Sequence, residues 1–380
     1  MGDIRQITTL RLAVAVSLVL ALVNHLLPPK GFAATQLLFD YHFGLIRRGL
    51  AGQVLDLFLG PKVTTGDIYM VAAIVTLTGA LGFVLFMWRA LNGHIGGLML
   101  LILAINAFAF ASFVGNTGYL DAILLALALA AMSTNAHSPI GLAARILAAV
   151  IGVLVHENML PYFTVLMGLD LWLAHQRRPV IAALPMLAGA VGVVVILAVM
   201  AAFPGDPAAF GTYLQSKAAF VLAAGSVVVA ERGIGDNLAL MAGLRGTVKY
   251  WAWVLFDGVP LLMMSLWLIW LANRVMPQAR RMDKALLAAA ILAPISLNLI
   301  AFDVVRFGVA SVLTGFVAVV LVLRHDPDAQ HRLTEILTWP HFVLVLVLNA
   351  NIFTLQVSEG AGHTSQFPWV LVTQLKWLSP

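Results

Sequence analysis

The stretch FDYHFGLIRRGLAGQ, residues 39–53, places an acid, a histidine and two adjacent arginines in a chain that is otherwise mostly apolar. A carboxylate such as that of Asp40 can take a proton from an attacking hydroxyl group and so act as a general base. Guanidinium groups such as those of Arg47 and Arg48 bind phosphate oxygens through paired hydrogen bonds. The stretch therefore predicts a base and an anion site about two helical turns apart.

Three further segments carry polar side chains where the chain is expected to turn: GNTGYLD, VHENMLPYF and AFDVVRFG. Charged groups are costly near a bilayer, so we expect these segments and the first one to share a site. The catalytic candidates are Asp40, His156 and Glu157; the phosphate-binding candidates are Arg47, Arg48, His42 and Arg306; the acceptor-binding or supporting candidates are Tyr41, Asn116, Tyr119, Asp121, Asn158 and Asp303.

Several candidates also have a purely structural explanation. Asp121 can stabilise the positive end of a helix dipole, and Asp303 and Arg306 can pair on one helical face. The polar residues 156–158 fit a hairpin turn without any chemistry. The arginine pair can bind lipid phosphates, and Tyr41 can anchor the chain at a membrane interface. The evidence for a shared site is therefore the four segments together.

The composition of the chain is that of an integral membrane protein. Of its 380 residues 61% are hydrophobic and only 10% are charged, and the mean hydropathy is +0.97. The pI of about 9.7 reflects Lys and Arg that set topology and meet anionic lipid, so we expect no nucleic-acid partner. The absence of cysteine excludes disulfides, thiolate metal sites and cysteine nucleophiles.

Long apolar runs separated by short polar stretches predict an all-α polytopic protein with about 11 transmembrane helices. The first run, followed by Pro28 and Pro29, lacks a convincing cleavage site and is expected to be retained. The expected spans are 10–27, 67–88, 95–113, 119–134, 140–156, 158–174, 180–203, 251–272, 284–301, 304–323 and 337–355.

The distribution of basic residues predicts which side of the membrane each loop faces. Arg and Lys are densest in short segments such as HQRRP and NRVMPQARRMDK, and Arg145 falls on the same side. By the positive-inside rule this side is cytoplasmic, with the N-terminus inside and the C-terminus outside. We expect a multi-pass protein of the bacterial cytoplasmic membrane whose site faces the periplasm or cell exterior.

The chain is expected to form a single transmembrane domain, 1–380, with three long outer segments. Residues 28–66 are expected to carry a juxtamembrane amphipathic helix over GLIRRGLAGQVLDLFLG. Residues 204–250 are expected to form short helices that fold over the outer face as a lid. Residues 356–380 form an outer C-terminal tail.

Several motifs that would indicate other chemistry are absent from the sequence. HENML lacks the second histidine of HExxH, and there is no Walker loop or dinucleotide fingerprint. Glycines in GHIGG and AGAVG fit close helix packing better than phosphate binding. Asp40, His156 and Glu157 carry ligand types that suit Mg²⁺ or Mn²⁺, but no spacing specifies such a divalent cation, so no cofactor is assigned.

An outward-facing enzyme with no nucleotide site must take its activated group from a molecule already across the membrane. A lipid-linked sugar meets this requirement, because its phosphate is the leaving group and no ATP is needed outside. Inverting glycosyl transfer then needs a carboxylate base, here Asp40, and cations for the departing phosphate, here Arg47 and Arg48.

A first span, an acid just outside it as FDY, and amphipathic juxtamembrane helices before the second span together resemble the GT-C superfamily of polyprenyl-phosphate-sugar-dependent glycosyltransferases. The resemblance is architectural and covers about half of the chain. It implies that Asp40 is the base and that Asp121 in GYLD helps to bind acceptor or metal. It also implies a lipid-linked sugar donor, a glycan, lipid or protein acceptor, and membrane lipids as partners. The paired acids of several members are missing here.

Two other kinds of function are consistent with the same sequence. An envelope polysaccharide polymerase or ligase would bind a lipid pyrophosphate oligosaccharide through Arg232 and Arg245 of the long outer loop. A transporter or lipid flippase would place charges at broken helices related by a repeat, and no repeat is visible. A purely structural subunit would leave the polar segments without a purpose.

Overall fold

The computed structural model describes residues 2–175, 177–202, 206–223, 225–227, 234–301, 303–326 and 328–350. The described residues are 79% helical and contain no strand, which confirms the all-α class. The chain divides into two compact units. Unit 1 comprises Met1–His25, Val84–Gly115 and Leu238–Pro380, and unit 2 comprises Leu26–Phe83 and Asn116–Asn237. Two of the four boundaries fall within α4 (Thr65–Leu91) and α13 (Ile234–Arg245), and the other two fall at the ends of α1 (Gly2–His25) and α6 (Phe108–Gly115).

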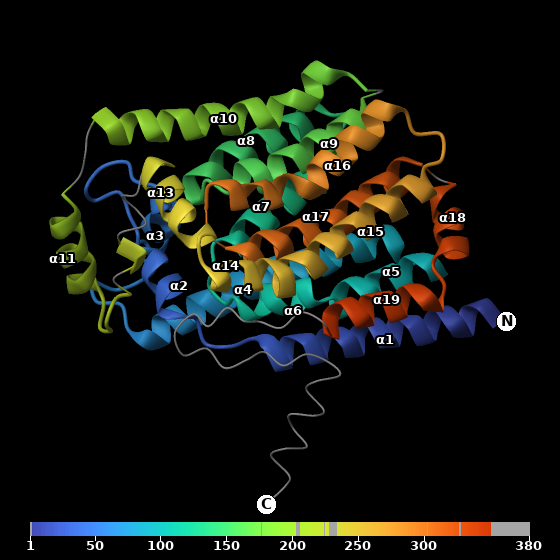
Figure 1. Ribbon diagram of the computed structural model, residues 1–380, viewed down its shortest axis with the longest axis horizontal. Coiled ribbons are helices and arrows are strands. Elements are labelled where there is room, and N and C mark those ends of the chain that lie inside the picture. The colour runs from blue at the N-terminus through green and yellow to red at the C-terminus, as the bar shows by residue number, and fades with distance from the viewer. Residues whose placement is uncertain are drawn as a thin grey trace, which may run out of the picture. The chain divides into compact units, whose positions relative to one another are not determined.

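Unit 1 is built around α17 (Val304–His325), which is buried from Val304 to Leu323. Its helices are α1 (Gly2–His25), α5 (Ile95–Asn106), α6 (Phe108–Gly115), α14 (Val248–Trp253), the π-helix η2 (Val254–Gly258), α15 (Val259–Val275), α16 (Arg281–Ser296), η3 (Leu297–Leu299), α17 (Val304–His325), α18 (Ala329–Ile336) and α19 (Trp339–Ala350). α17 packs against α15, α16 and α6 (Figure 1). Gly308 and Gly315 bring α17 close to α15, because a Cβ at either position would lie under 3 Å from a leucine side chain.

Unit 2 holds the remaining helices and most of the candidate residues. It contains α2 (Gly31–Gln36), α3 (Gly49–Leu55), most of α4, α7 (Asp121–Met132), α8 (Pro139–Val155), the π-helix η1 (Leu160–Thr164), α9 (Val165–Ala174), α10 (Pro179–Ala202) and α11 (Pro207–Lys217). α10 packs along α8 and α9, and α7 packs on α8 (Figure 1). α3 contacts α8, which brings the segment around residue 48 to the end of α8.

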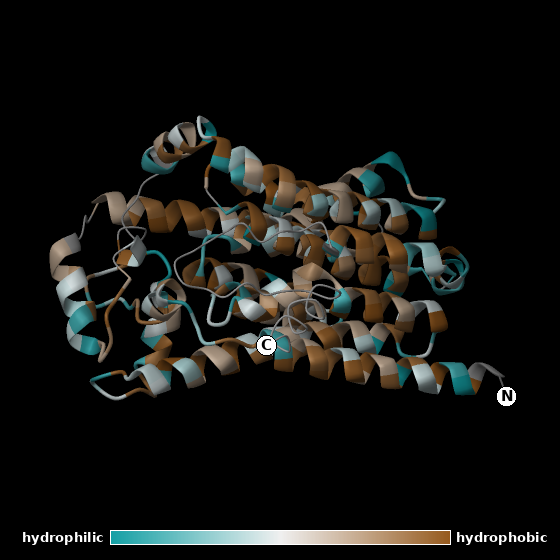
Figure 2. Ribbon diagram, turned by 60° about the horizontal axis from the view of Figure 1, so that its bottom comes forward, coloured by the Kyte–Doolittle hydropathy of each residue, from teal (hydrophilic) through white to brown (hydrophobic). Residues whose placement is uncertain are grey.

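Six described helices are long and apolar enough to cross a membrane, or seven if the bent pair of α5 and α6 is one span. Each of the other expected spans contains an apolar helix of only 10–17 residues. A 12-residue helix is about 18 Å long and a bilayer core is about 30 Å thick. The helices are therefore compatible with a multi-pass membrane protein, and the count of about 11 spans stays a prediction. Figure 2 shows apolar residues along the helices and hydrophilic residues gathered at their ends.

The three long segments that were expected to face outward differ in detail from that expectation. The amphipathic helix expected from about residue 45 is only α3, Gly49–Leu55, because Arg48 has a φ of 66° and interrupts the helical backbone. Segment 204–250 contains short helices as expected, α11 and α13. The tail 356–380 lies outside the described residues. The close-packing role of GHIGG is confirmed, since a Cβ at Gly96 would be 2.7 Å from the Thr334 backbone.

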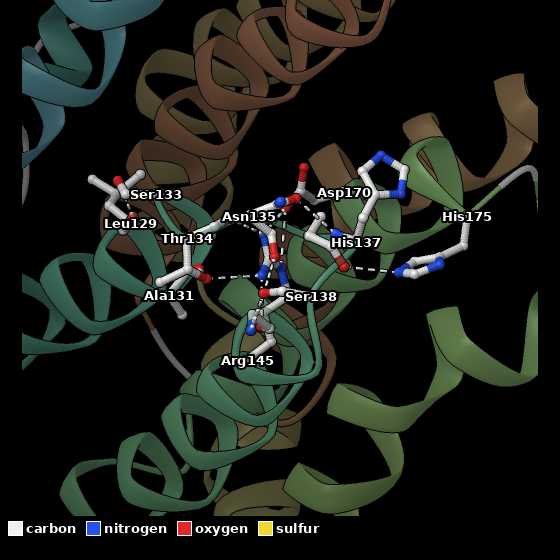
Figure 3. Close-up of polar contacts among 12 residues, drawn as sticks. Leu129, Ala131, Ser133, Thr134, Asn135, His137, Ser138, Arg145, Asp170 and His175 are labelled. Carbon is white, nitrogen blue, oxygen red and sulfur yellow. Dashed lines mark hydrogen bonds and ion pairs between the residues drawn. The ribbon is translucent and has the colours of Figure 1, made fainter.

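The position of Arg145 differs from the expectation that it belongs with the basic residues of the cytoplasmic loops. It is fully buried in α8 and forms an ion pair with the fully buried Asp170 of α9. Its other donors bind the Thr134 hydroxyl and the Gly141 carbonyl, at 3.2 and 2.6 Å (Figure 3). Arg145 therefore joins α7, α8 and α9 inside unit 2, because a buried guanidinium must be paired and hydrogen-bonded.

Candidate functional site

Two glycines fold the opening stretch back on itself. A Cβ at Gly52 would lie 2.1 Å from the carbonyl oxygen of Phe39, and a Cβ at Gly49 would lie 2.4 Å from the ring of Tyr41. The Tyr41 backbone N–H also donates to the side-chain oxygen of Gln53 at 3.1 Å. The two glycines of RGLAG thus let α3 lie directly against residues 39–41, which carry Asp40.

Asp40 is held inside this fold and is only 1% exposed. Its Oδ1 accepts the backbone N–H of His42 at 2.9 Å. Its Oδ2 accepts the Tyr213 hydroxyl and the Lys217 ammonium, each at 2.7 Å. The buried carboxylate is therefore compensated by one positive charge and by hydrogen bonds on both oxygens.

Tyr213 and Lys217 come from α11, which the sequence specifies locally. Asp206 caps the helix by accepting the N–H groups of Ala208 and Ala209, and Pro207 occupies the first helical position. Residues four apart lie on one helical face, so Tyr213 and Lys217 reach Asp40 together. Two backbone hydrogen bonds fix the end of α11. The Val63 N–H donates to the Lys217 carbonyl, and the Ala219 N–H donates to the Val63 carbonyl.

A second carboxylate joins Lys217. Asp56 follows the last residue of α3, and its Oδ1 accepts the Lys217 ammonium at 2.5 Å. Its side chain is 30% exposed, whereas that of Asp40 is 2% exposed. We name Asp40, Asp56, Tyr213 and Lys217 the Lys217 cluster. With two carboxylates and one ammonium, it carries one net negative charge when both acids are ionised.

The environment moves the pKa values of the two acids in opposite directions. Burial would raise the pKa of Asp40, but hydrogen bonds from Lys217, Tyr213 and the His42 backbone outweigh it and lower this pKa. The pKa of Asp56 is raised, by burial and by the neighbouring Asp40 charge against the opposing effect of Lys217. Burial would lower the pKa of Lys217, but the two carboxylates that it contacts outweigh this effect and raise it. Burial and the neighbouring Asp40 raise the pKa of Tyr213 to about 12.

Aromatic rings surround the cluster. The His42 imidazole stacks on the Tyr213 ring with centroids 4.3 Å apart. Phe43 meets Tyr213 and Phe210 edge to face, and Phe210 also meets Phe39 in this way. His42 itself is exposed and, in the described structure, lies on the α11 side of the segment rather than beside the arginine pair.

Arg47 and Arg48 both lie against Glu157, which directly follows α8. Arg48 binds it with two hydrogen bonds, Nη2 to Oε1 at 2.6 Å and Nε to Oε2 at 3.2 Å. The Arg47 Nη1 lies 3.9 Å from Oε1. Burial alone would raise the pKa of Glu157, but the charges of Arg48, His156 and Arg47 and the hydrogen bonds of Arg48 hold it well below its usual range.

His156 and Asn158 shape the turn that presents Glu157. His156 ends α8 and is 1% exposed, and the backbone N–H of Asn158 donates to its Nδ1 at 3.0 Å. The Glu157 Oε2 lies 3.4 Å from the same nitrogen. The described contacts give both residues a role in the turn, and their predicted chemical roles stay predictions.

Three more candidates lie in unit 2, at the start of α7. Asp121 is in the first turn of α7, which fits the dipole explanation. The Asn116 carbonyl accepts the Tyr119 backbone N–H at 3.1 Å, which forms the turn before the helix. The Tyr119 ring stacks with Phe32, with centroids 6.2 Å apart. The Tyr41 hydroxyl is buried, without a hydrogen-bond partner among the described residues.

Asp303 and Arg306 belong to unit 1 and are described within it. Asp303 is the N-cap of α17, and its Oδ1 accepts the Arg306 backbone N–H at 3.1 Å. Arg306 is 9% exposed. The capping interaction accounts for the acid at this position, and the proposal that these residues join Asp40 stays a prediction.

Three residues of the site escaped the sequence analysis: Asp56, Tyr213 and Lys217. The sequence predicts Asp56 as part of the amphipathic helix, and it predicts the residues of α11 as part of a lid. The DP start of α11 and the four-residue spacing in YLQSK were usable signals for a helix presenting a tyrosine and a lysine on one face. Their partner could not be read from local sequence, since Lys217 is 177 positions from Asp40.

No group of three or more His, Asp or Glu side chains suited to a metal ion occurs in the described ranges. Asp40, His156 and Glu157 therefore do not form one ligand set there. Comparisons with known proteins found no matching family model, no matching curated protein and no matching solved structure.

Proposed function

We propose that this protein is a membrane glycosyltransferase that moves a sugar from a polyprenyl-phosphate-linked donor to a hydroxyl-bearing acceptor. The observation that carries the proposal is one short segment, residues 39–56, that presents carboxylates to Lys217 and guanidinium groups to Glu157. Such a combination supplies a base for the attacking hydroxyl and cations for a departing phosphate.

The position of the segment supports a substrate that stays in the membrane. In the sequence, the segment lies between α1 and α4, both of which are long and apolar enough to span a bilayer. A lipid-linked donor brings its own leaving group and needs no nucleotide site. The site faces the outside of a bacterial cytoplasmic membrane in this proposal, with the N-terminus inside, as the basic loops predict.

The arginine pair is the proposed phosphate site. Arg48 now makes to Glu157 the bidentate contact that it would make to a phosphate, because carboxylate and phosphate present similar paired oxygens. A donor phosphate would share or replace Glu157 at these guanidinium groups. The Arg48 backbone, with φ at 66°, is in a region that costs about 1–2 kcal/mol for a non-glycine residue. The ion pair compensates for this cost.

The reaction balances without any further reagent. The acceptor oxygen attacks the anomeric carbon and loses its proton to a carboxylate of the site. The bond between the anomeric carbon and the phosphate oxygen breaks, and polyprenyl phosphate leaves with the bonding electron pair. A glycan, a lipid or a protein can supply the hydroxyl.

The test uses the purified chain in lipid nanodiscs with two classes of donor. The first is a polyprenyl monophosphate carrying a single radiolabelled hexose or pentose, and the second a polyprenyl diphosphate carrying an oligosaccharide. Mass spectrometry measures release of polyprenyl phosphate, and membrane extracts serve as acceptor. We expect consumption of a monophosphate donor. Consumption of the diphosphate donor alone would instead identify a polymerase or ligase, and consumption of neither would exclude both transferases.

A further inference from the structure

The two carboxylates of the Lys217 cluster are not equivalent. Both oxygens of Asp40 accept hydrogen bonds, from His42, Tyr213 and Lys217, and the side chain is 2% exposed. At this exposure the carboxylate offers almost no surface to a substrate hydroxyl, and Oδ2 already accepts two hydrogen bonds. Asp40, the acid that the sequence analysis expected to be the base, is therefore closed to an incoming substrate.

Asp56 has the opposite character. Within the described residues its carboxylate receives one hydrogen bond, from Lys217 to Oδ1, and its side chain is 30% exposed. One oxygen is thus fixed in place while the carboxylate stays accessible. A base must be within hydrogen-bonding reach of the proton that it removes, so accessibility separates the two acids.

We propose that Asp56 is the catalytic base of the transfer reaction and that Asp40 is a positioning residue that holds Lys217. This inference rests on the proposed function. Lys217 bridges the two acids, at 2.7 Å from Asp40 and 2.5 Å from Asp56. Asp40 fixes the ammonium, and the ammonium fixes the Asp56 carboxylate.

The surroundings of Asp56 suit a substrate with a lipid tail. The next two residues, Leu57 and Phe58, are 76% and 79% exposed, so the base adjoins an apolar surface. Large exposed apolar side chains next to a charged group are typical of a membrane interface. The chain of a polyprenyl donor or the acyl chains of the membrane match this surface.

In the proposed step the acceptor hydroxyl gives its proton to the accessible oxygen of Asp56 as its oxygen bonds to the anomeric carbon. The bond from that carbon to the phosphate oxygen breaks, and polyprenyl phosphate leaves as the anion. The proton then passes from Asp56 to water. Lys217 keeps its proton throughout, because it remains paired with Asp40.

The test compares Asp56→Asn, Asp56→Glu, Asp40→Asn and a matched control, Asp67→Asn. Asp67 is a carboxylate in the first turn of α4, and among the described residues it accepts hydrogen bonds only from Thr64. Donor consumption is measured as a function of pH, with kcat and KM determined separately. Thermal unfolding of each purified variant shows whether it is folded.

We expect Asp56→Asn to lower kcat about 100-fold or more, the usual contribution of a general base, with KM for the donor within twofold and no acid limb in the pH profile. Asp56→Glu should restore part of the activity, and Asp67→Asn should match the wild type. Asp40→Asn should keep an acid limb at a shifted pH. The assignment of Asp56 as base would be wrong if a folded Asp56→Asn variant kept the wild-type kcat, or if only Asp40→Asn lost the acid limb. Either result would leave the proposed function intact. A wild type that consumes no donor would overturn the proposed function as well.

Discussion

Gly52 lies against Phe39 so closely that a single added methyl group would come within 2.1 Å of the Phe39 carbonyl oxygen. This contact joins α3 to the residues around Asp40, and through α3 it fixes the positions of both Arg48 and Asp56. The geometry of both charge clusters in the segment therefore depends on one residue without a side chain.

Replacement of Gly52 by alanine should separate α3 from residues 39–41. The opposing atom is a backbone oxygen, which cannot rotate away, so the backbone must shift, at a cost of about 1–3 kcal/mol or more. Thermal unfolding in detergent, followed by tryptophan fluorescence, should show a lower midpoint than the wild type.

Gly60→Ala is the matched control, because nothing lies within 4 Å of a Cβ at that position. It should unfold at the wild-type temperature. Equal unfolding temperatures for Gly52→Ala and the wild type would contradict the described contact.

Removal of the ammonium by Lys217→Met should leave the buried Asp40 without its counter-charge. Loss of one partner of a buried pair typically costs about 3–5 kcal/mol, and the partial exposure of Asp56 places the value at the lower end. The double variant Lys217→Met with Asp40→Asn should recover part of this loss, since no unpaired buried charge remains. A double-mutant cycle on chemical unfolding measures the coupling, and additive effects would disprove it.

Protein stability should fall in acid because of Glu157. The pKa of this residue in the folded protein is well below its ordinary value of 4.5, so the unfolded chain binds a proton first as the pH falls. The stabilisation is complete above the ordinary pKa and is lost as the pH falls through the lowered one. Unfolding midpoints measured from pH 6 to pH 3 should decline, and Glu157→Gln should make the curve flatter. A parallel decline in the variant would assign the effect to other acids.

Activity should respond to pH through Asp56. Its pKa is raised above the ordinary 3.8 by burial and by Asp40, so a base at this position becomes active only as the pH rises past that higher value. Asp40→Asn removes a neighbouring negative charge while Lys217 remains, so the acid limb of kcat should move to lower pH. A move to higher pH would show that Asp40 does not act on Asp56 through its charge.

Arg145 and Asp170 should be strongly coupled in folding. Arg145→Met or Asp170→Leu alone leaves one charge buried and unpaired, at a cost of about 3–5 kcal/mol, whereas removal of both can be nearly neutral. Unfolding of the two single variants and of the double variant in detergent measures this coupling. A double variant as unstable as the sum of the single ones would mean that the pair does not act as a unit.

The helices could be predicted from sequence because apolar runs of membrane length leave the backbone no alternative to internal hydrogen bonds. The break before α3 could not, because it depends on the left-handed backbone of Arg48, which Glu157 helps to hold. Arg145 looked like a topology marker because a sequence shows residue type and approximate depth, but not that Asp170 lies on the adjacent helix.

The sequence predicts only part of the candidate site, because it shows residue types but not which distant residues the fold brings together. Asp40, Arg47 and Arg48 stand out as charges beside an apolar run, and the structure pairs each of them. Asp56 and Lys217 have ordinary residue types for a surface helix and a loop. Only the fold brings them together.

The lysine that balances Asp40 is made late. Lys217 follows Asp40 by 177 positions, and the stretch between them includes α4 and α10, each long enough to cross the membrane. Until α11 emerges, the acid has no permanent counter-ion and must remain hydrated or protonated. Chains that end before residue 217 therefore carry the Asp40 carboxylate without the ammonium group that compensates it in the folded protein.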